Sequence, residues 1–280
     1  MMRGRIVVGT DGSASSTAAV EWAVADAQRR GLPLRIVHVC EQWSRGMDSS
    51  EYCAGALEAA ADRARDLSRD VEVSTEMLAG NVIEALIGES VSAESLVLGS
   101  RGLGGFAGMV LGSVGLSVAG HAVGPVVIVR GPVVVPHDQI VVGDDGSEGS
   151  RQAVAYAVEQ ARARHARLHV VYAWQEAVVS TYWAAYSLLL ADTFQEEADA
   201  ARARVAPWRE ANPDVVITDE QVRDHPVAAL IKAAATADLA VVGSRGLGGF
   251  RSAVLGSVSH GVLHHVACPV AVVRPRGEPE

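Results

Sequence analysis

The 280-residue chain is longer than one typical domain and suits two domains of roughly 140 residues each. Apolar residues make up 49% of it and charged residues 20%, which is the balance of a globular protein. The formal net charge is 24 − 33 = −9, and nucleic-acid binding depends on a basic surface, so we expect no nucleic-acid partner. No apolar run reaches the roughly 20 residues that span a bilayer, so we expect a cytoplasmic protein without membrane attachment.

The first predicted strand, Ile6 to Val8, ends in an Asp-Gly-Ser turn that contains Asp11. A carboxylate at this end of a parallel strand faces the ligand crevice, where it could bond a base or ribose or reach a phosphate-bound metal. The same residues could instead form an Asx turn, with Ser13 capping the next helix. We favour the binding role and leave the structural one open.

A helix with one buried stripe follows, because Val20, Ala23, Val24 and Ala27 recur at i, i+3, i+4 and i+7. Short apolar strands and helical patterns then alternate. Strands of this kind predict a parallel sheet covered on both faces, since right-handed crossovers place helices on either side. The sequence therefore predicts a doubly wound, Rossmann-like α/β domain with five parallel strands. The four further strands are expected at Leu34 to Val39, Val71 to Met77, Leu96 to Leu98 and Val126 to Val129.

The three cysteines, Cys40, Cys53 and Cys268, are an odd number without CxxC spacing. We therefore expect neither a disulfide framework nor a thiolate metal site.

A glycine block follows the fourth predicted strand. Gly99 and Gly102 come first, and after nine residues Gly112 and Ser113 open the next helix. Glycines let backbone N–H groups approach an anion, and a helix start adds unpaired amides and the positive end of the helix dipole. Ser113 could cap the helix or bond a phosphate oxygen. The block predicts a phosphate site; glycines needed only for tight packing are the alternative.

Two better-known phosphate motifs do not apply. The Walker sequence GxxxxGK[ST] is absent, since Lys232 does not follow a glycine. The stretch from Gly102 to Ala107 fits GxGxxG/A, but it follows the fourth strand, and Arg251 stands at the position of Ala107 in the second copy. We treat this match as accidental.

The whole pattern occurs twice. IVVGTDGS at 6–13 recurs as IVVGDDGS at 140–147, and GSRGLGGFAGMVLGSV at 99–114 recurs as GSRGLGGFRSAVLGSV at 243–258. The helical stripe also recurs at Val154, Ala157, Val158 and Ala161. Such self-similarity predicts two nucleotide-binding domains at 1–131 and 139–276, joined by a linker at 132–138.

The second copy carries an apolar insertion, Ser180 to Leu190, which has no counterpart in the first. We interpret it as a longer second helix covering the sheet; a contact surface between lobes or subunits is the alternative.

The spacing G-x2-G-x9-G-[ST] after the fourth strand, with Asp in the first-strand turn, closely resembles the ATP-binding branch of the universal stress proteins. The resemblance covers nearly the whole chain in both copies, which implies the tandem-domain form. It implies adenine between the first-strand turn and the end of the second strand, with phosphates on the glycine block. The binding residues so implied are Thr10, Asp11, Gly12, Ser13, Val39, Gly99, Arg101, Gly102, Gly112, Ser113 and Val114 in the first lobe, and Asp144, Asp145, Gly146, Ser147, Ala173, Gly243, Arg245, Gly246, Gly256, Ser257 and Val258 in the second.

The two sites need not be equal. Asp144 stands where the first lobe has Thr10, Gly115 stands where the second has Ser259, and Asp224 to Pro226 replace Gly80 to Val82. An extra carboxylate repels phosphate unless a divalent cation intervenes, so we expect the second site to depend more on Mg²⁺.

Three functions remain open. The first is an ATP-binding regulator of stress or dormancy that is not an enzyme; the second is a slow ATP-hydrolysing enzyme; the third is a scaffold that binds no nucleotide. The glycine blocks offer no acid–base pair, so no catalytic residue is assigned. His260, His264 and His265 form the best candidate metal cluster, because two of them lie at i, i+4 on one helix, but no third ligand is identifiable. We interpret them as an exposed helix face.

The last strand of a doubly wound sheet is an apolar edge that invites pairing. We therefore expect a homodimer through Val126 to Val129 or Val270 to Val273, or pairing of the two lobes with each other there.

Overall fold

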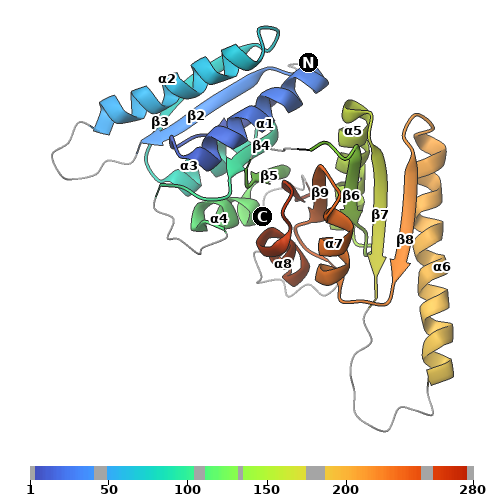
Figure 1. The fold of residues 1–280 in the computed structure, drawn as a ribbon. Helices are drawn as coiled ribbons and strands as arrows, with labels where there is room; N and C mark the ends of the chain where they lie inside the picture. Colours follow the sequence, from blue (N-terminus) through green and yellow to red (C-terminus); the bar gives the residue numbers. More distant parts are fainter. Residues whose placement is uncertain are drawn as a thin grey trace.

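The computed structural model describes residues 4–40, 49–103, 111–131, 135–174, 187–246 and 255–275. Each lobe repeats one order of strands and helices (Figure 1). The first lobe contains β1 (Arg5–Gly9), α1 (Ala14–Arg30), β2 (Leu34–Cys40), α2 (Ser49–Leu67), β3 (Val73–Ala79), α3 (Val82–Ser90), β4 (Ala93–Gly99), α4 (Ser113–His121) and β5 (Pro125–Val129). The second contains β6 (Gln139–Gly143), α5 (Glu148–Arg164), β7 (Arg167–Ala173), α6 (Ser187–Ala211), β8 (Ile217–Val222), α7 (Pro226–Ala234), β9 (Leu239–Gly243), α8 (Ser257–His265) and β10 (Val270–Val273).

The strands of both lobes form a single ten-stranded sheet in the order β3-β2-β1-β4-β5-β10-β9-β6-β7-β8. Within each lobe the five strands are parallel, as the sequence predicts. Strand order reverses beside β1 and beside β6, which places the crevice of each lobe at the carboxyl ends of these strands. The doubly wound α/β fold is confirmed in both copies.

The lobes meet through β5 and β10, which pair antiparallel with Val270 opposite Ile128 and Val273 opposite Pro125. This is the second of the two outcomes expected for these edge strands. Since each strand already has neighbours on both sides, neither is free to pair with another chain, and a homodimer through them is excluded in this structure. The sheet instead ends at β3 and β8.

The first helix of each lobe forms where its end signals lie. Ser13 accepts from the amide of Ser16 at the start of α1, and Ser147 accepts from Ser150 at the start of α5. Helix α1 ends at Gly31 in the left-handed conformation, and α5 ends at His165 in the same conformation. Both predicted stripes are buried: Val20, Ala23, Val24 and Ala27, and Val154, Ala157, Val158 and Ala161.

Two layers of helices cover the sheet. Buried residues of α1, α2, α5 and α6 form one apolar core with the strands, whereas residues of α3, α4, α7 and α8 form a second core on the opposite face. In Figure 1 the two lobes therefore lie side by side along one continuous sheet.

A polar cluster is buried where α1 meets α5. Asp26 and Gln160 are both fully inaccessible to solvent. Asp26 accepts hydrogen bonds from Arg164 Nη2 at 3.1 Å and Gln160 Nε2 at 3.3 Å, and Arg30 Nη1 lies 3.6 Å away. Arg164 also donates to Gln160 Oε1 and stacks over Trp22. The cluster satisfies a buried carboxylate with groups from both lobes.

The expectation that the cysteines form no disulfide is wrong. Cys40, at the end of β2, is joined to Cys53, near the start of α2, with their Cα atoms 6.0 Å apart. Helix α2 packs against β2, so two residues without a recognisable spacing become neighbours. Cys268 is a free thiol, and burial raises its pKa to about 12.

The apolar insertion contributes to a long helix. Helix α6 has 25 residues and α2 has 19, and α6 contains the last four inserted residues, Ser187 to Leu190. Residues 180–186 lie outside the described part of the chain. None of the described helices combines the length and apolarity needed to cross a membrane.

Candidate functional site

A cavity of about 410 Å³ opens at the carboxyl ends of β1, β2 and β4 in the first lobe. Nine of the predicted binding residues line it, and they come from three separate segments of the chain. These are Thr10, Asp11, Val39, Gly99, Arg101, Gly102, Gly112, Ser113 and Val114. The fold thus brings the first-strand turn, the end of β2 and the glycine block to one place.

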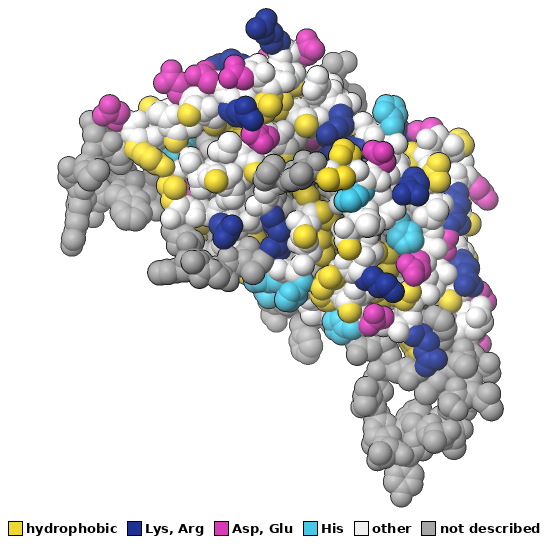
Figure 2. All heavy atoms as spheres, in the orientation of Figure 1, with side chains coloured by type: hydrophobic (Ala, Val, Ile, Leu, Met, Phe, Trp, Pro, Cys, Tyr) yellow, Lys and Arg dark blue, Asp and Glu magenta, His cyan; other side chains and the backbone are white. Residues whose placement is uncertain are grey.

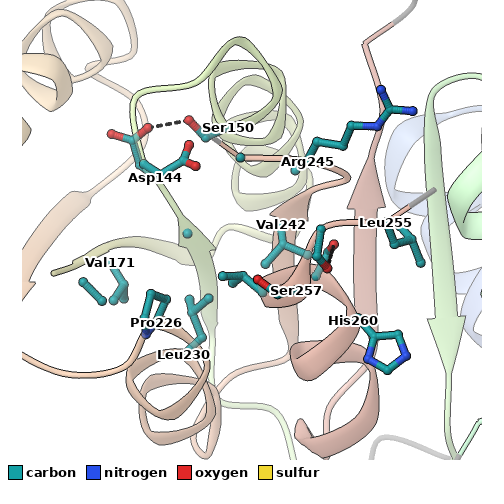
Figure 3. A pocket seen from close by; sticks show the side chains of 18 residues that line it. Asp144, Ser150, Val171, Pro226, Leu230, Val242, Arg245, Leu255, Ser257 and His260 are labelled. Carbon is teal, nitrogen blue, oxygen red and sulfur yellow. Dashed lines mark hydrogen bonds between the residues drawn. The ribbon is translucent and has the colours of Figure 1, made fainter. Parts of the chain in front are cut away.

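The matching cavity of the second lobe is larger, about 660 Å³, and gathers the equivalent residues (Figure 3). Its predicted lining residues are Asp144, Asp145, Ala173, Gly243, Arg245, Gly246, Gly256, Ser257 and Val258. Figure 3 shows Asp144 beside Ser150 and Ser257 near Val242, while the apolar side chains of Val171, Pro226 and Leu230 lie together at the lower left.

Four predicted residues lie in the adjoining turns and do not line either cavity. Gly12 and Gly146 adopt φ of +81°, a conformation that favours glycine. Ser13 and Ser147 cap α1 and α5 through their side chains. These four residues shape the turn that carries the aspartates.

Asp11 links the first-strand turn to the glycine block. Its Oδ1 accepts from the amide of Ser13 at 3.0 Å, which is the Asx turn considered as the alternative to a binding role, and its Oδ2 accepts from the amide of Leu103 at 3.0 Å. Burial alone would raise the pKa of Asp11, but the hydrogen bonds from Ser13, Ser16 and Leu103 outweigh it and hold this pKa below its usual value. Asp11 therefore stays ionised at the cavity mouth.

Two different structural constraints explain why these positions of the block are occupied by glycine. A Cβ on Gly102 would lie 2.7 Å from Asp11 Oδ2, and one on Gly246 would overlap Asp145 Oδ2. A side chain at either position would therefore collide with the aspartate before it reached any phosphate. On Gly99 a Cβ would lie 2.7 Å from the backbone of Ser15, so this glycine permits close packing of α1 against β4.

The helices that follow the glycine blocks begin without a capping side chain. Gly112 is the N-cap of α4 and Gly256 that of α8, whereas α1, α3, α5 and α7 are capped by side-chain acceptors. Ser113 is the first helical residue, so the capping role considered for it is wrong, and it lines the cavity instead. The amide of Gly112 donates to Ser100 O at 2.7 Å. The next amides of the first turn are those available to an anion.

The two sites differ at Thr10 and Asp144. Thr10 Oγ1 lies 3.2 Å from Ser16 Oγ, and Asp144 Oδ1 accepts from Ser150 Oγ at 2.8 Å in the equivalent place. The extra charge of Asp144 is paired, because Arg204 Nε donates to its Oδ2 at 3.1 Å. Arg204 also stacks over Tyr172. The premise that Asp144 needs a divalent cation for neutralisation is therefore corrected: a side chain of α6 supplies the positive charge.

Replacing Arg204 with methionine should make nucleotide binding at the second site depend on a divalent cation, because the positive charge beside Asp144 would be lost. Asp144 would then be a nearly buried, unpaired carboxylate, and its field should weaken nucleotide binding roughly tenfold without Mg²⁺. Titration of the second lobe with and without a chelator measures this.

The matched control is the double substitution Asp144→Thr with Arg204→Ala, which copies the first lobe. Counting back from the ends of α2 and α6 makes Ala60 the counterpart of Arg204. The double variant should bind nucleotide with native affinity whether or not the chelator is present. Equal chelator responses of the native protein, the Arg204→Met variant and the double variant would contradict the conclusion that Arg204 neutralises Asp144.

Several lining residues carry no chemical signature and were not predicted. Val37, Val82, Leu86 and Leu98 form the apolar wall of the first cavity, and Val171, Leu230, Val242 and Leu255 form that of the second. Val37 could have been found from Val39, since residues two apart share one face of a strand. Val82 and Leu86 lie at i, i+4 on α3, but nothing in the sequence separates such a pair from ordinary core.

The charged side chains at the cavities have defined partners or directions. In Figure 3 the guanidinium of Arg245 extends away from Asp144 and Ser257. His260 lines the second cavity and its ring lies 4.5 Å from that of His264, whose pKa is lowered by burial and by its histidine neighbours. Within the described ranges, no group of three or more His, Cys, Asp or Glu side chains could hold a metal ion. On the face drawn in Figure 2, basic and acidic side chains are interspersed.

The comparisons with known proteins agree with this geometry. The model of the universal stress protein family matches residues 2–130 and again 136–274. A universal stress protein of Mycolicibacterium smegmatis is 34% identical over 292 residues, covering 97% of each chain, and one of Mycobacterium tuberculosis is 36% identical over 290 residues, covering 96% of each. The crystal structure of a universal stress protein from Archaeoglobus fulgidus shares the fold, with a TM-score of 0.73 at 23% identity over 99% of this chain and 97% of that one. The chain therefore belongs to the universal stress protein family, in its tandem two-domain form.

Proposed function

We propose that each lobe binds one adenine nucleotide and that bound ATP makes the protein a regulator of stress or dormancy in the cytoplasm. The observation that carries this proposal is the paired cavity at the strand ends, into which a glycine loop and an uncapped helix start both open. Helix amides and dipole favour phosphate groups, and charge-assisted hydrogen bonds contribute about 1.5 to 3 kcal/mol each. The apolar wall on the other side of each cavity suits a flat aromatic base.

The inventory of groups favours signalling over catalysis. Asp11 is engaged by two backbone amides, Asp144 is engaged by Arg204 and Ser150, and Arg245 extends away from the cavity centre. Groups that hold ground state and transition state equally give affinity without turnover. We infer that the protein is not an enzyme and that any Mg²⁺ enters with the phosphates. Slow hydrolysis is the alternative, and among the described residues His260, which lines the second cavity and not the first, would be the candidate base for it.

A homodimer remains part of this proposal, but it must use a surface other than β5 and β10. The open sheet edges at β3 and β8 and the outer helix faces are the available surfaces.

The proposal is tested on freshly purified protein. Denaturation should release an adenine nucleotide, identified by mass spectrometry, and calorimetric titration of the emptied protein with AMP, ADP and ATP should give a stoichiometry near two. Phosphate release from labelled ATP and Mg²⁺ should stay far below the roughly 1 to 1,000 per second of ordinary enzymes. A chain that binds no nucleotide would be a scaffold, and turnover near one per second that is lost in His260→Ala would make it a hydrolase.

A further inference from the structure

We propose that the nucleotide site of the first lobe is under thiol–disulfide control through Cys40 and Cys53, and that the second site is not. The inference rests on the proposed nucleotide binding and specifies how one of the two sites is regulated. Oxidation of the two thiols by a peroxide tightens the site, and reduction by a dithiol loosens it.

The disulfide lies directly beside the first cavity. Cys40 is the last residue of β2 and follows Val39, which lines the cavity. Cys53 is buried near the start of α2. The bond therefore fixes the start of α2 against the strand end at which the base is expected to lie.

The start of α2 in turn holds the first-strand turn through Tyr52. Its hydroxyl donates to the carbonyl oxygen of Asp11 at 3.0 Å and sits against Gly12, on which a Cβ would lie 3.0 Å from the hydroxyl oxygen. The Tyr52 ring also meets the ring of the buried His38 edge-on, with centroids 6.5 Å apart. Tyr52, which directly precedes the disulfide-bonded Cys53, thus contacts the first-strand turn.

Asp11 carries this restraint to the phosphate side of the site. Its backbone is held by Tyr52, and its carboxylate holds the amide of Leu103 in the glycine block. One continuous set of contacts therefore runs from the disulfide through Tyr52 and Asp11 to the loop that would bind phosphate. Breaking the disulfide therefore loosens the protein both where the base is expected to bind and where the phosphates are expected to bind.

The second lobe has no oxidisable counterpart. The strand registers align Trp174 with Cys40, and counting back from the ends of α2 and α6 makes Glu197 the counterpart of Cys53. There the helix is tied to the strand by Tyr172, whose hydroxyl donates to Glu197 at 3.0 Å. Burial and this hydrogen bond raise the pKa of Tyr172 to about 12, so the tie does not change with redox conditions or across ordinary pH.

The chemistry balances with a peroxide as oxidant. One cysteine thiolate attacks a peroxide oxygen, which gives a sulfenic acid and releases water. The second sulfur attacks the sulfenic sulfur, the S–S bond forms, and the hydroxide leaves as a second water. Two thiols and one hydrogen peroxide thus give one disulfide and two waters. A dithiol reverses this by exchange, forming its own disulfide while both cysteines regain their protons.

The arrangement suits a reversible bond. A Cα separation of 6.0 Å lies in the usual range for a disulfide, so the two thiols can close without rearrangement of the sheet. In a reducing compartment such as the proposed cytoplasm, disulfides are usually transient and redox-sensing. Cys268 does not compete, because burial raises its pKa to about 12 and leaves little thiolate.

The test isolates each site and changes only the redox state. In a Gly256→Val background, which blocks the second cavity, ATP is titrated into protein treated with hydrogen peroxide or with dithiothreitol. Reduction should lower affinity roughly two- to tenfold, the effect of losing about one hydrogen bond. In a Gly112→Val background, which leaves the second site, the two states should bind alike.

Three variants make the result specific. Cys53→Ser should bind like the reduced form under both treatments, and Cys268→Ser should respond like the native chain. Tyr52→Phe should keep the disulfide, seen as a two-proton mass difference between treatments, but lose the affinity change. Equal affinities in the two redox states, or free Cys40 and Cys53 thiols after peroxide treatment, would overturn the inference while leaving nucleotide binding intact. A first lobe that binds no adenine nucleotide in either state would show instead that the proposed function is wrong for that lobe, and the inference would fall with it.

Discussion

Replacing Gly112 with valine should lower nucleotide affinity of the first lobe at least about a hundredfold, because roughly two charge-assisted hydrogen bonds to phosphate would be blocked. Its φ of −78° and ψ of 153° are open to any residue. A Cβ there would make ordinary contacts, 3.6 Å from Ser100 O and 3.7 Å from Arg101 Cα, in the space between the loop and the start of α4. The backbone conformation therefore tolerates valine, whose side chain would occupy the space where a phosphate group is expected to bind.

Gly256→Val should have the same effect on the second lobe, where a Cβ would lie 3.5 Å from Arg245 Cα. Calorimetry should then give a stoichiometry near one for each variant and no binding for the double variant. The free energy of unfolding should change by no more than about 1 kcal/mol, the usual scale of a changed helix cap.

Gly88→Ala is the matched control, since it lies on α3 outside the cavity and no atom lies within 4 Å of its new Cβ. It should bind two nucleotides and be about 0.5 to 1 kcal/mol more stable. Two nucleotides bound to the Gly112 and Gly256 double variant would mean that the glycine blocks do not hold phosphate. These positions test the site more cleanly than Gly102 or Gly246, where a side chain strikes an aspartate first.

Asp26→Asn should lower the free energy of unfolding by about 3 to 5 kcal/mol, the usual effect of breaking a buried ion pair from one side. The substitution keeps the shape of the side chain but leaves Arg30 and Arg164, each about 10% exposed or less, without the carboxylate that both contact. Urea unfolding followed by tryptophan fluorescence measures the change, because Trp22 lies under Arg164.

Glu21→Gln provides the control, since Glu21 lies on α1 like Asp26 but pairs with Arg63 of α2 near the surface. Exposed pairs contribute at most about 1 kcal/mol. A loss for Asp26→Asn no greater than that of this control would show that the lobe junction does not depend on the carboxylate.

Most of the fold could be predicted from the repeated sequence, because the patterns that indicate helices and strands are local. The stripe of Val20, Ala23, Val24 and Ala27 fixes a helix and its buried face, and the apolar strands fix a parallel sheet. The sequence did not decide whether β5 and β10 pair with each other or with another chain. An apolar edge strand has the same sequence whether it pairs with its own chain or with another, so only the path of the whole chain decides.

The parts of the site that escaped prediction depend on contacts between distant segments. Cys40 and Cys53 meet only because α2 packs back against the end of β2. Arg204 reaches Asp144 only because the register of the longer α6 aligns it with the turn after β6, 60 residues earlier. Neither pairing has a spacing rule, whereas the glycine block, being one contiguous segment at a strand end, was recognisable from the sequence.

The junction between the lobes distinguishes unlike partners from like ones. The repeat offset of 134 makes Gln160 the counterpart of Asp26 and Arg164 that of Arg30. Two first lobes packed in this way would place two buried carboxylates where Asp26 now accepts from Gln160 at 3.3 Å, and two second lobes would lack the fully buried carboxylate that both arginines now contact. The first mismatch brings two like charges together and the second removes the buried partner of the arginines, so both are disfavoured. The two lobes are therefore not interchangeable, because the buried junction favours pairing of one lobe with the other. Every molecule thus contains one lobe with the Cys40–Cys53 disulfide and one lobe in which Arg204 pairs with Asp144.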